Sequence, residues 1–350
     1  MVVKTIRIGN KKIGEGEPCF IIAEAGVNHN GSVEIAKKLV NAAKAAGADA
    51  VKFQTFTTEN LVTKDTKKAE YQGKGSQFDM LKKLELKKED FVGLRRYCDE
   101  KEILFLSTPH TEDAIDFIDA LVPLFKIGSG DLTNLQLIEK VAKKGKPVFI
   151  SVGMATMDEI REAVEVIKKY KVPFIILHCT TNYPCPKKDA NLNVIGVLRK
   201  EFDCPVGYSD HTEGIDIPTM AASLGAVVVE KHFTLDKNME GPDHKASLNP
   251  LELREMVDAI RSKKKIDIPR EVLGNGLKKP TKEELEFAKF VRKSVVTKKD
   301  VPTGVKITKE MLIIKRPGTG IPPKDIEKII GKTAKHAIKK DALISWEDVE

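Results

Sequence analysis

Short apolar runs rich in β-branched residues alternate with longer amphipathic stretches along the first 270 residues of the chain. The amphipathic stretches, such as 33–47 and 157–170, repeat their apolar residues at helical spacing and carry charged residues on the opposite face. The apolar runs predict eight strands, which are Phe20–Ala23, Ala50–Phe53, Ile103–Ser107, Leu124–Ile127, Val148–Val152, Phe174–His178, Val206–Tyr208 and Ala226–Glu230. Eight strand–helix repeats over about 250 residues favour an α/β fold of the (β/α)8 TIM-barrel type over an open doubly wound sheet.

Two segments depart from this alternation. The stretch 57–88, between the second and third predicted strands, is polar and rich in Lys, and we expect a loop with a short helix that covers one mouth of the barrel. After about residue 265 the chain becomes charged and rich in Pro and Gly, and 291–350 then contains short strand-like pieces. The predicted organisation is therefore a barrel over 1–270, a linker over 271–290 and a small β-rich domain over 291–350.

The charge of the chain is concentrated in its last part. The 350 residues include 59 Lys and Arg against 51 Asp and Glu, a net charge of +8, and residues 271–350 contribute +6 of it with 18 basic and 12 acidic residues. A basic tail suits nucleic acid or an anionic ligand. This tail lacks the interleaved aromatic residues of a platform for single strands, so we do not expect nucleic acid as a partner.

Other features of the sequence indicate a cytoplasmic protein. No apolar run approaches the 18 residues of a membrane span, and the start of the chain lacks the continuous apolar segment of a secretion signal, so no membrane partner is expected. Five cysteines are too few for a disulfide framework, which favours a reducing compartment. Cys179 and Cys185 have no CxxC partner, and we expect them to be small buried residues.

Polar residues stand at the ends of all eight predicted strands, which is where barrel enzymes place their active sites. Each residue alone has an ordinary explanation, as a solvated Lys, a structural His or a Ser that caps a helix. Their coincidence at one topological position favours a functional site, because a charge at the end of a packed strand is costly unless it is paired or used.

The residue types at these strand ends fit two kinds of site. Lys52 and Lys126, with the hydroxyl groups of Thr108, Ser129 and Ser151, predict a cationic pocket for a phosphate or a carboxylate. The Gly-rich turn 128–130 adds free N–H groups at a helix start. His211 and His232, from adjacent strands, can share a divalent metal in an open Mn²⁺-like site, with Zn²⁺ as the alternative.

The order of several motifs resembles the sialic acid (N-acetylneuraminate) synthase family. These motifs are AEAGVNHNG, VKFQTF, KIGSGD, SVGM, LHCTTNYP, GYSDHTEG and VVVEKHFTLDKNMEGPDHKAS. The segments IIKRPGTGIPP and IGKTAKHAIKKDALI resemble the antifreeze-like (SAF, β-clip) domain that those enzymes carry, and the resemblance covers residues 15–350. It implies condensation of phosphoenolpyruvate with an N-acyl amino sugar and water to a nine-carbon 2-keto sugar acid and phosphate.

The resemblance also implies roles for residues of this chain. Phosphoenolpyruvate would be held by Lys52, Thr108, Lys126, Ser129, Ser151 and Ser209, and the open-chain sugar by Glu24, Tyr183 and Asp243, with Gln54 and Thr181 completing the substrate-binding set. His211 and His232 would bind Mn²⁺, or Mg²⁺ in its place. Glu24 or Asp131 would carry the proton of the attacking water; Asp131 stands where members often have Glu, and Thr181 where an Asn is common.

The tail domain has an expected role as well. Arg316 would reach the barrel of a neighbouring subunit and contact the N-acyl group, which implies a domain-swapped homodimer. Two alternatives remain: a related phosphoenolpyruvate-condensing synthase of the legionaminic or pseudaminic type, or one that acts on a phosphorylated sugar. A protein without enzymatic activity that binds nucleic acid or ice is the third, less favoured hypothesis.

Overall fold

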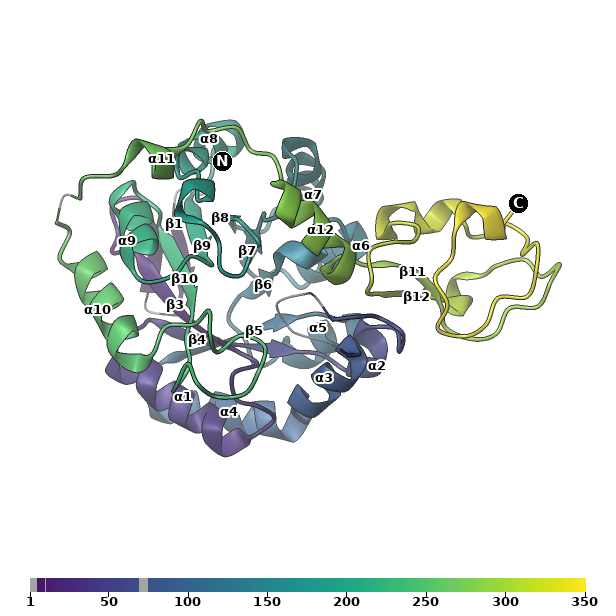
Figure 1. The fold of residues 1–350 in the computed structure, drawn as a ribbon, viewed down its shortest axis with the longest axis horizontal. Helices are drawn as coiled ribbons and strands as arrows, with labels where there is room; N and C mark the ends of the chain where they lie inside the picture. The colour runs from purple at the N-terminus through teal and green to yellow at the C-terminus, as the bar shows by residue number, and fades with distance from the viewer. Residues whose placement is uncertain (1–4, 10, 69–74, 265) are drawn as a thin grey trace.

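Eight parallel strands form the centre of the molecule in a computed structural model, which describes residues 5–9, 11–68, 75–264 and 266–350. The strands follow the order β5-β4-β3-β10-β9-β8-β7-β6, and β5 and β6 lie side by side, so the sheet curls into a nearly closed barrel (Figure 1). The strands are β3 Phe20–Gly26, β4 Ala50–Thr55, β5 Leu104–Pro109, β6 Phe125–Ile127, β7 Val148–Ser151, β8 Phe174–Cys179, β9 Val206–Asp210 and β10 Val228–His232. The predicted barrel is confirmed, and most strands extend beyond their predicted apolar runs to include the polar residues that follow.

Helices surround this sheet (Figure 1). They are α1 Val33–Ala45, α4 Lys88–Glu100, α5 Glu112–Ile118, α6 Leu135–Ala142, α7 Met157–Lys169, α8 Asn193–Phe202, α9 Asp216–Ser223 and α10 Pro250–Arg261. In α7 the buried residues Ile160, Ala163, Val164 and Ile167 recur every three or four positions, so one face of the helix packs on the barrel. The main core lies in this layer between helices and strands.

A hairpin that the sequence pattern did not reveal packs beside the barrel core. Strands β1 (Thr5–Ile8) and β2 (Lys11–Gly14) pair antiparallel. Ile6, Ile8 and Ile13 are buried in one apolar cluster with Phe20 and Phe149, residues that begin or lie within barrel strands. The amino-terminal end of the barrel is therefore filled with apolar side chains, and the polar residues gather at the opposite end.

The insertion between β4 and α4 borders that polar end. It contains the short helices α2 (Thr58–Leu61) and α3 (Gln77–Leu84), while residues 69–74 of the predicted loop lie outside the described residues. Leu61, Leu81 and Leu84 pack with Phe56 in a small apolar cluster. Gln77, Met80 and Leu81 also line the cavity at the barrel mouth, which agrees with the expected cover.

The C-terminal part continues from the barrel through two helices, α11 (Arg270–Leu273) and α12 (Lys282–Val291). The predicted linker thus contains a helix that lies against the barrel and precedes the small domain (Figure 1). That domain pairs β11 (Ser294–Thr297) with β12 (Leu312–Lys315) and buries a core of its own, including Val295, Val301 and Ile344. Among the described residues, no helix combines the length and apolar character needed to cross a bilayer.

Candidate active site

One cavity at the carboxyl end of the barrel strands brings together nearly all of the predicted site residues. Its lining includes Glu24, Lys52, Gln54, Thr108, Lys126, Ser129, Ser151, Thr181, Tyr183, Ser209, His211, His232, Asp243 and Arg316. Asp131 is the predicted residue that does not line it. Residues predicted from the strand ends thus line one cavity, while the roles assigned to them stay predictions.

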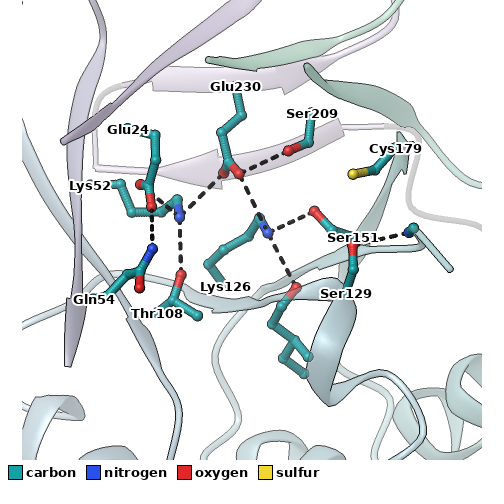
Figure 2. A network of polar contacts seen from close by, with 12 residues as sticks. Glu24, Lys52, Gln54, Thr108, Lys126, Ser129, Ser151, Cys179, Ser209 and Glu230 are labelled. Carbon is teal, nitrogen blue, oxygen red and sulfur yellow. Dashed lines mark hydrogen bonds and ion pairs between the residues drawn. The ribbon is translucent and has the colours of Figure 1, made fainter. Parts of the chain in front are cut away.

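The first buried lysine, Lys52 on β4, joins residues of the neighbouring strands β3 and β5. Its Nζ lies 2.8 Å from Glu24 Oε2 and donates to Thr108 Oγ1 at 3.0 Å (Figure 2). Gln54, two residues along β4, donates from Nε2 to Glu24 Oε1 at 3.3 Å. Side chains two residues apart on a strand point to the same face of the sheet, so Lys52 and Gln54 both reach Glu24.

The second buried lysine, Lys126 on β6, lies across from Lys52 in the cavity. We call the charged group formed by Glu24, Lys52, Lys126 and Glu230 the floor of the cavity. Its Nζ donates to Ser151 Oγ at 2.7 Å. Glu230 on β10 lies between the lysines, with one oxygen 3.6 Å from Lys52 Nζ and the other 3.6 Å from Lys126 Nζ, and it accepts from Ser209 Oγ at 3.1 Å (Figure 2). Glu230 therefore connects both halves of the floor. The sequence places Glu230 at the end of a predicted strand and does not by itself indicate a role for it.

Burial and neighbouring charges shift the pKa values of the two carboxylates, Glu24 and Glu230, in opposite directions. Burial raises the pKa of Glu24 to about 7, and the Glu230 carboxylate adds to this effect against the opposing Lys52 charge. Burial alone would raise the pKa of Glu230 too, but Lys126 and Lys52 outweigh it and lower that pKa. Burial also lowers the pKa of Lys126. Glu24 is thus the member of the network that most readily takes up a proton near neutral pH.

The loops after β6, β7 and β8 meet closely beside this floor. Ser129, the first residue of the 3₁₀ turn Ser129–Asp131, accepts at Oγ from the Gly153 N–H at 3.0 Å. A Cβ atom on Gly153 would lie 1.9 Å from Thr181 Oγ1. Only glycine fits at this position, which lets the three loops form one continuous polar wall.

His211 and His232 lie near each other, with ring centroids 5.7 Å apart. His211 Nδ1 lies 2.9 Å from the Thr180 carbonyl oxygen, and its Nε2 lies 2.9 Å from the Tyr183 hydroxyl. His232 Nδ1 is buried without a hydrogen-bond partner, and burial holds the pKa of His232 well below its usual range. A neutral imidazole with an unused buried nitrogen is a suitable metal ligand.

The two histidines can supply two ligands to a metal ion, although an ion bound at His211 Nε2 would replace the contact of that atom with the Tyr183 hydroxyl. Within the described part of the chain, no cluster of three or more His, Cys, Asp or Glu is arranged to hold a metal ion. A structural zinc site would use four protein ligands, so this pair does not fit one. It fits an ion whose remaining positions are filled by water or substrate.

Asp131 lies behind the cavity. Its Oδ1 pairs with Lys293 Nζ at 2.6 Å and its Oδ2 lies 3.2 Å from His110 Nδ1. Burial opposes ionisation, but the Lys293 charge and the bonds from both partners lower the pKa of Asp131 to about 2. Of the two carboxylates expected to carry a proton, Glu24 faces the cavity and Asp131 does not.

Residues from outside the strands complete the wall. Asp243 is half-buried at the mouth, and burial raises its pKa to about 6. Phe287 on α12 lies 5.7 Å from Tyr183 between ring centroids and also lines the cavity. The capping box formed by Thr281 and Glu284 is a signal in the sequence for this helix, but the charged composition of the stretch is also typical of a linker.

Arg316 lies at the mouth of its own barrel. We expected it to reach a neighbouring subunit, but within the single chain its N–H donates to the Leu61 carbonyl at 2.9 Å and its carbonyl accepts from the Thr63 N–H at 3.1 Å. Val62 and Arg316 form a parallel bridge. The contact thus joins β12 of the small domain to the insertion helix α2 of the same chain.

The cysteines agree with their expected roles. All five are free, and Cys179 and Cys185 are buried. Cys179 also lines the cavity, with Sγ 3.6 Å from His211 Nδ1.

The fold and the cavity define a class of protein: a (β/α)8 barrel with a charged cavity at the carboxyl end of its strands and a small C-terminal β domain. The family model described as NeuB family matches residues 39–268, and the SAF domain model matches residues 292–350. The chain belongs to the NeuB family. The resemblance seen in the motifs is therefore confirmed.

Individual relatives match over almost the whole chain. The chain is 45% identical to the N,N'-diacetyllegionaminic acid synthase of Legionella pneumophila, covering 98% of each chain. It is 39% identical to the N-acetylneuraminate-9-phosphate synthase of Mus musculus, covering 97% of this chain and 94% of the relative. The crystal structure of the spore coat polysaccharide biosynthesis protein SpsE from Bacillus subtilis covers 99% of both chains with a TM-score of 0.86 and 35% identity.

Proposed function

We propose that the protein condenses phosphoenolpyruvate with an N-acyl amino sugar of the N-acetylmannosamine type, and with water, to give a nine-carbon 2-keto sugar acid and phosphate. The observation that carries this proposal is the pair of buried lysines, Lys52 and Lys126, set among hydroxyl groups on the floor of one cavity. Two relatives are named as sugar-acid synthases, one for diacetyllegionaminic acid and one for N-acetylneuraminate 9-phosphate, which supports the same class of product.

Phosphoenolpyruvate carries a phosphate and a carboxylate, and the floor offers two cations to match them. Lys126 lies beside Ser151, and Lys52 lies beside Thr108, so each ammonium is accompanied by a hydroxyl donor. Ser129 and Ser209 supply two more. The attraction between a lysine and an anion is stronger away from water than at an exposed position, because solvent screens the two charges less. In this proposal the substrate takes over lysine contacts that Glu24 and Glu230 now make.

The reaction needs one new C–C bond and one broken C–O bond. C3 of phosphoenolpyruvate attacks the aldehyde carbon of the open-chain sugar, whose oxygen takes up a proton, and C2 is left with cationic character. Water adds to C2 and loses one proton, which leaves a hydroxyl group on that carbon. The bond from C2 to the phosphate oxygen then breaks, and the proton of that hydroxyl passes to the leaving phosphate, which gives the ketone and hydrogen phosphate. We assign the proton transfer to Glu24 because it is the candidate carboxylate that lines the cavity.

The sugar would occupy the outer part of the cavity. In this proposal Asp243 and Tyr183, which line the cavity, form hydrogen bonds with its hydroxyl groups, and Arg316 contacts the N-acyl oxygen. His211 and His232 would hold a divalent ion, Mn²⁺ or Mg²⁺, which when bound supplies Lewis-acid polarisation of the sugar aldehyde.

The domain-swapped homodimer stays part of the proposal. The C-terminal domain projects from the barrel as a separate lobe joined through α12 (Figure 1). A lobe of this kind can exchange between two copies and make the same contacts with the partner's barrel. Within the single chain, Arg316 already reaches a barrel mouth, so an exchange would change which chain supplies it but not the composition of the site.

A phosphate-release assay with a set of sugars tests the function. The protein is incubated with phosphoenolpyruvate, Mn²⁺ and one acceptor: N-acetylmannosamine, its 6-phosphate, or a doubly N-acetylated deoxy sugar of the legionaminic or pseudaminic type. We expect phosphate release that requires both substrates and is fastest with unphosphorylated N-acetylmannosamine, together with a product of the corresponding mass. A faster reaction with another acceptor would reassign the sugar. No release with any acceptor would disprove the function.

A further inference from the structure

A single buried carboxylate from α12 holds two loops of the cavity wall. Glu284, which is 1% exposed, accepts at Oε1 from the Met154 N–H at 2.7 Å and from the Thr181 N–H at 2.8 Å. Its Oε2 accepts from the Thr281 N–H at 3.0 Å. Met154 follows β7 and Thr181 follows β8, so one side chain joins the ends of two barrel strands to the start of α12.

The backbone that Glu284 holds adopts an unfavourable conformation. Met154 has a φ of 57°, in the left-handed region that a residue with a side chain rarely occupies. Such a conformation persists only where surrounding contacts enforce it. Here Glu284 binds its N–H, and Arg292 donates from Nη2 to its carbonyl oxygen at 2.7 Å. Glu284 belongs to α12, and Arg292 is the residue that directly follows this helix.

The enforced turn is adjacent to the polar wall of the cavity. Gly153, next to Met154, donates to Ser129 Oγ at 3.0 Å, and the space where its Cβ would lie is filled by Thr181 Oγ1. Ser151, two residues further back, accepts from Lys126. Release of the Glu284 contacts would therefore loosen Ser129, Ser151 and Thr181 against one another.

We propose that Glu284 is a positioning residue for the part of the site that contains Ser129, Ser151 and Thr181, which is the part proposed to bind phosphoenolpyruvate. Glu284 does not line the cavity, and its carboxylate is occupied by three backbone N–H groups, so it acts through the loops and not on the substrate. This inference rests on the proposed function for the identity of the ligand. It assigns α12 a role in substrate affinity that is separate from Arg316 in the following domain.

Three variants of the full chain test the proposal. Glu284→Ala removes the contacts to both loops, Glu284→Gln keeps a neutral acceptor for them, and Glu283→Ala changes the exposed neighbour on the same helix as the control. Hydrogen bonds to a charged acceptor are strong enough that we expect Glu284→Ala to weaken phosphoenolpyruvate binding about tenfold or more. Glu284→Gln should weaken it less, and Glu283→Ala should match the wild type.

Three measurements separate positioning from a general loss of structure. Calorimetry gives the Kd of phosphoenolpyruvate without sugar, steady-state kinetics give KM for each substrate, and hydrogen exchange reports protection of the peptides that contain Met154 and Thr181. We expect a higher KM for phosphoenolpyruvate, an unchanged KM for the sugar and faster exchange in those two peptides. If Glu284→Ala does not fold, the same comparison is made with Glu284→Gln.

The proposal is overturned if the Glu284 variants bind phosphoenolpyruvate as the wild type does, or if both KM values are unchanged while activity falls only in proportion to folded protein. Failure of the proposed function gives a different result. In that case the wild type itself neither binds phosphoenolpyruvate nor releases phosphate, whereas faster exchange at Met154 and Thr181 in Glu284→Ala would still report the loss of the contacts.

Discussion

Lys293 from the start of the small domain pairs with Asp131 of the barrel, with 2.6 Å between Nζ and Oδ1. Both side chains are 2% exposed, and Lys293 also donates to the His110 carbonyl oxygen. The chain packs closely at this point, because a Cβ on Gly130 would lie 2.9 Å from the Val291 carbonyl oxygen. The C-terminal domain is therefore attached to the barrel directly behind the cavity by a buried ion pair.

Lys293→Met should destabilise the protein strongly. Removal of one partner leaves the Asp131 carboxylate buried and unpaired, which costs roughly 3–5 kcal/mol in comparable pairs. Urea unfolding measures the free energy of unfolding, and Lys289→Met on the exposed side of α12 is the control. The double variant Lys293→Met with Asp131→Leu should recover part of the loss. Equal stability of Lys293→Met and the control would show that the pair contributes nothing.

The pH dependence of stability should reveal the same ion pair. The pKa of Asp131 is lowered to about 2 in the folded protein, below the value of about 3.9 for a free Asp. A lowered carboxylate pKa stabilises the fold above the unfolded pKa, and this stabilisation is lost as the pH falls through the folded pKa. We expect wild type to exceed Asp131→Asn in stability by a constant amount above about pH 5, with the difference shrinking towards pH 2. A difference that does not vary with pH would contradict the assignment.

The barrel and the gathering of polar residues at one of its ends were predictable because both follow from local patterns. Alternating apolar runs and amphipathic helices determine the fold class, and polar residues that directly follow strands must meet at one end of the barrel. Lys52, Lys126 and His211 were found in this way and line the cavity.

The residues that the sequence misplaced depend on contacts between distant segments. Asp131 belongs to the same 3₁₀ turn as Ser129, yet it points to Lys293 behind the cavity while Ser129 lines it, and spacing alone does not reveal which way a turn residue faces. Glu284 meets Thr181, 103 positions away in sequence, from a stretch whose charge and prolines resembled a linker. The hydrophobic residues of the β1–β2 hairpin are likewise buried only through contacts with the barrel core.

Removal of a divalent metal should abolish the activity. Treatment with EDTA is expected to reduce phosphate release at least a hundredfold, with recovery on addition of Mn²⁺. His211→Ala and His232→Ala should show a similar loss and bind Mn²⁺ more weakly in calorimetry, because only their imidazoles are proposed to hold the ion. His336→Ala, at an exposed histidine of the small domain, is the control. Full activity of the EDTA-treated protein would exclude the metal.

Gly153→Ala should impair phosphoenolpyruvate binding. The added methyl group would lie 1.9 Å from Thr181 Oγ1 and 2.9 Å from Ser129 Oγ, so the polar wall has to open. We expect a KM for phosphoenolpyruvate raised at least tenfold, with overpacking destabilising the protein by about 1–3 kcal/mol. Gly196→Ala on α8 meets no atom within 4 Å and is the matched control. An unchanged KM would show that this contact does not shape the binding site.

Co-expression of two inactive variants should determine which chain supplies Arg316. Arg316→Ala removes the cation from the small domain and Lys52→Ala removes one from the barrel, and both residues line the same cavity. In a swapped heterodimer, the barrel with intact Lys52 receives the intact Arg316 of its partner, so one complete site forms. We therefore expect purified heterodimers to regain activity that neither variant has alone. Lys52→Ala with Lys126→Ala is the control, because both changes lie in the barrel and no complete barrel can form. Absence of recovery in the first pair would instead assign Arg316 to its own barrel, in the arrangement that the single chain adopts.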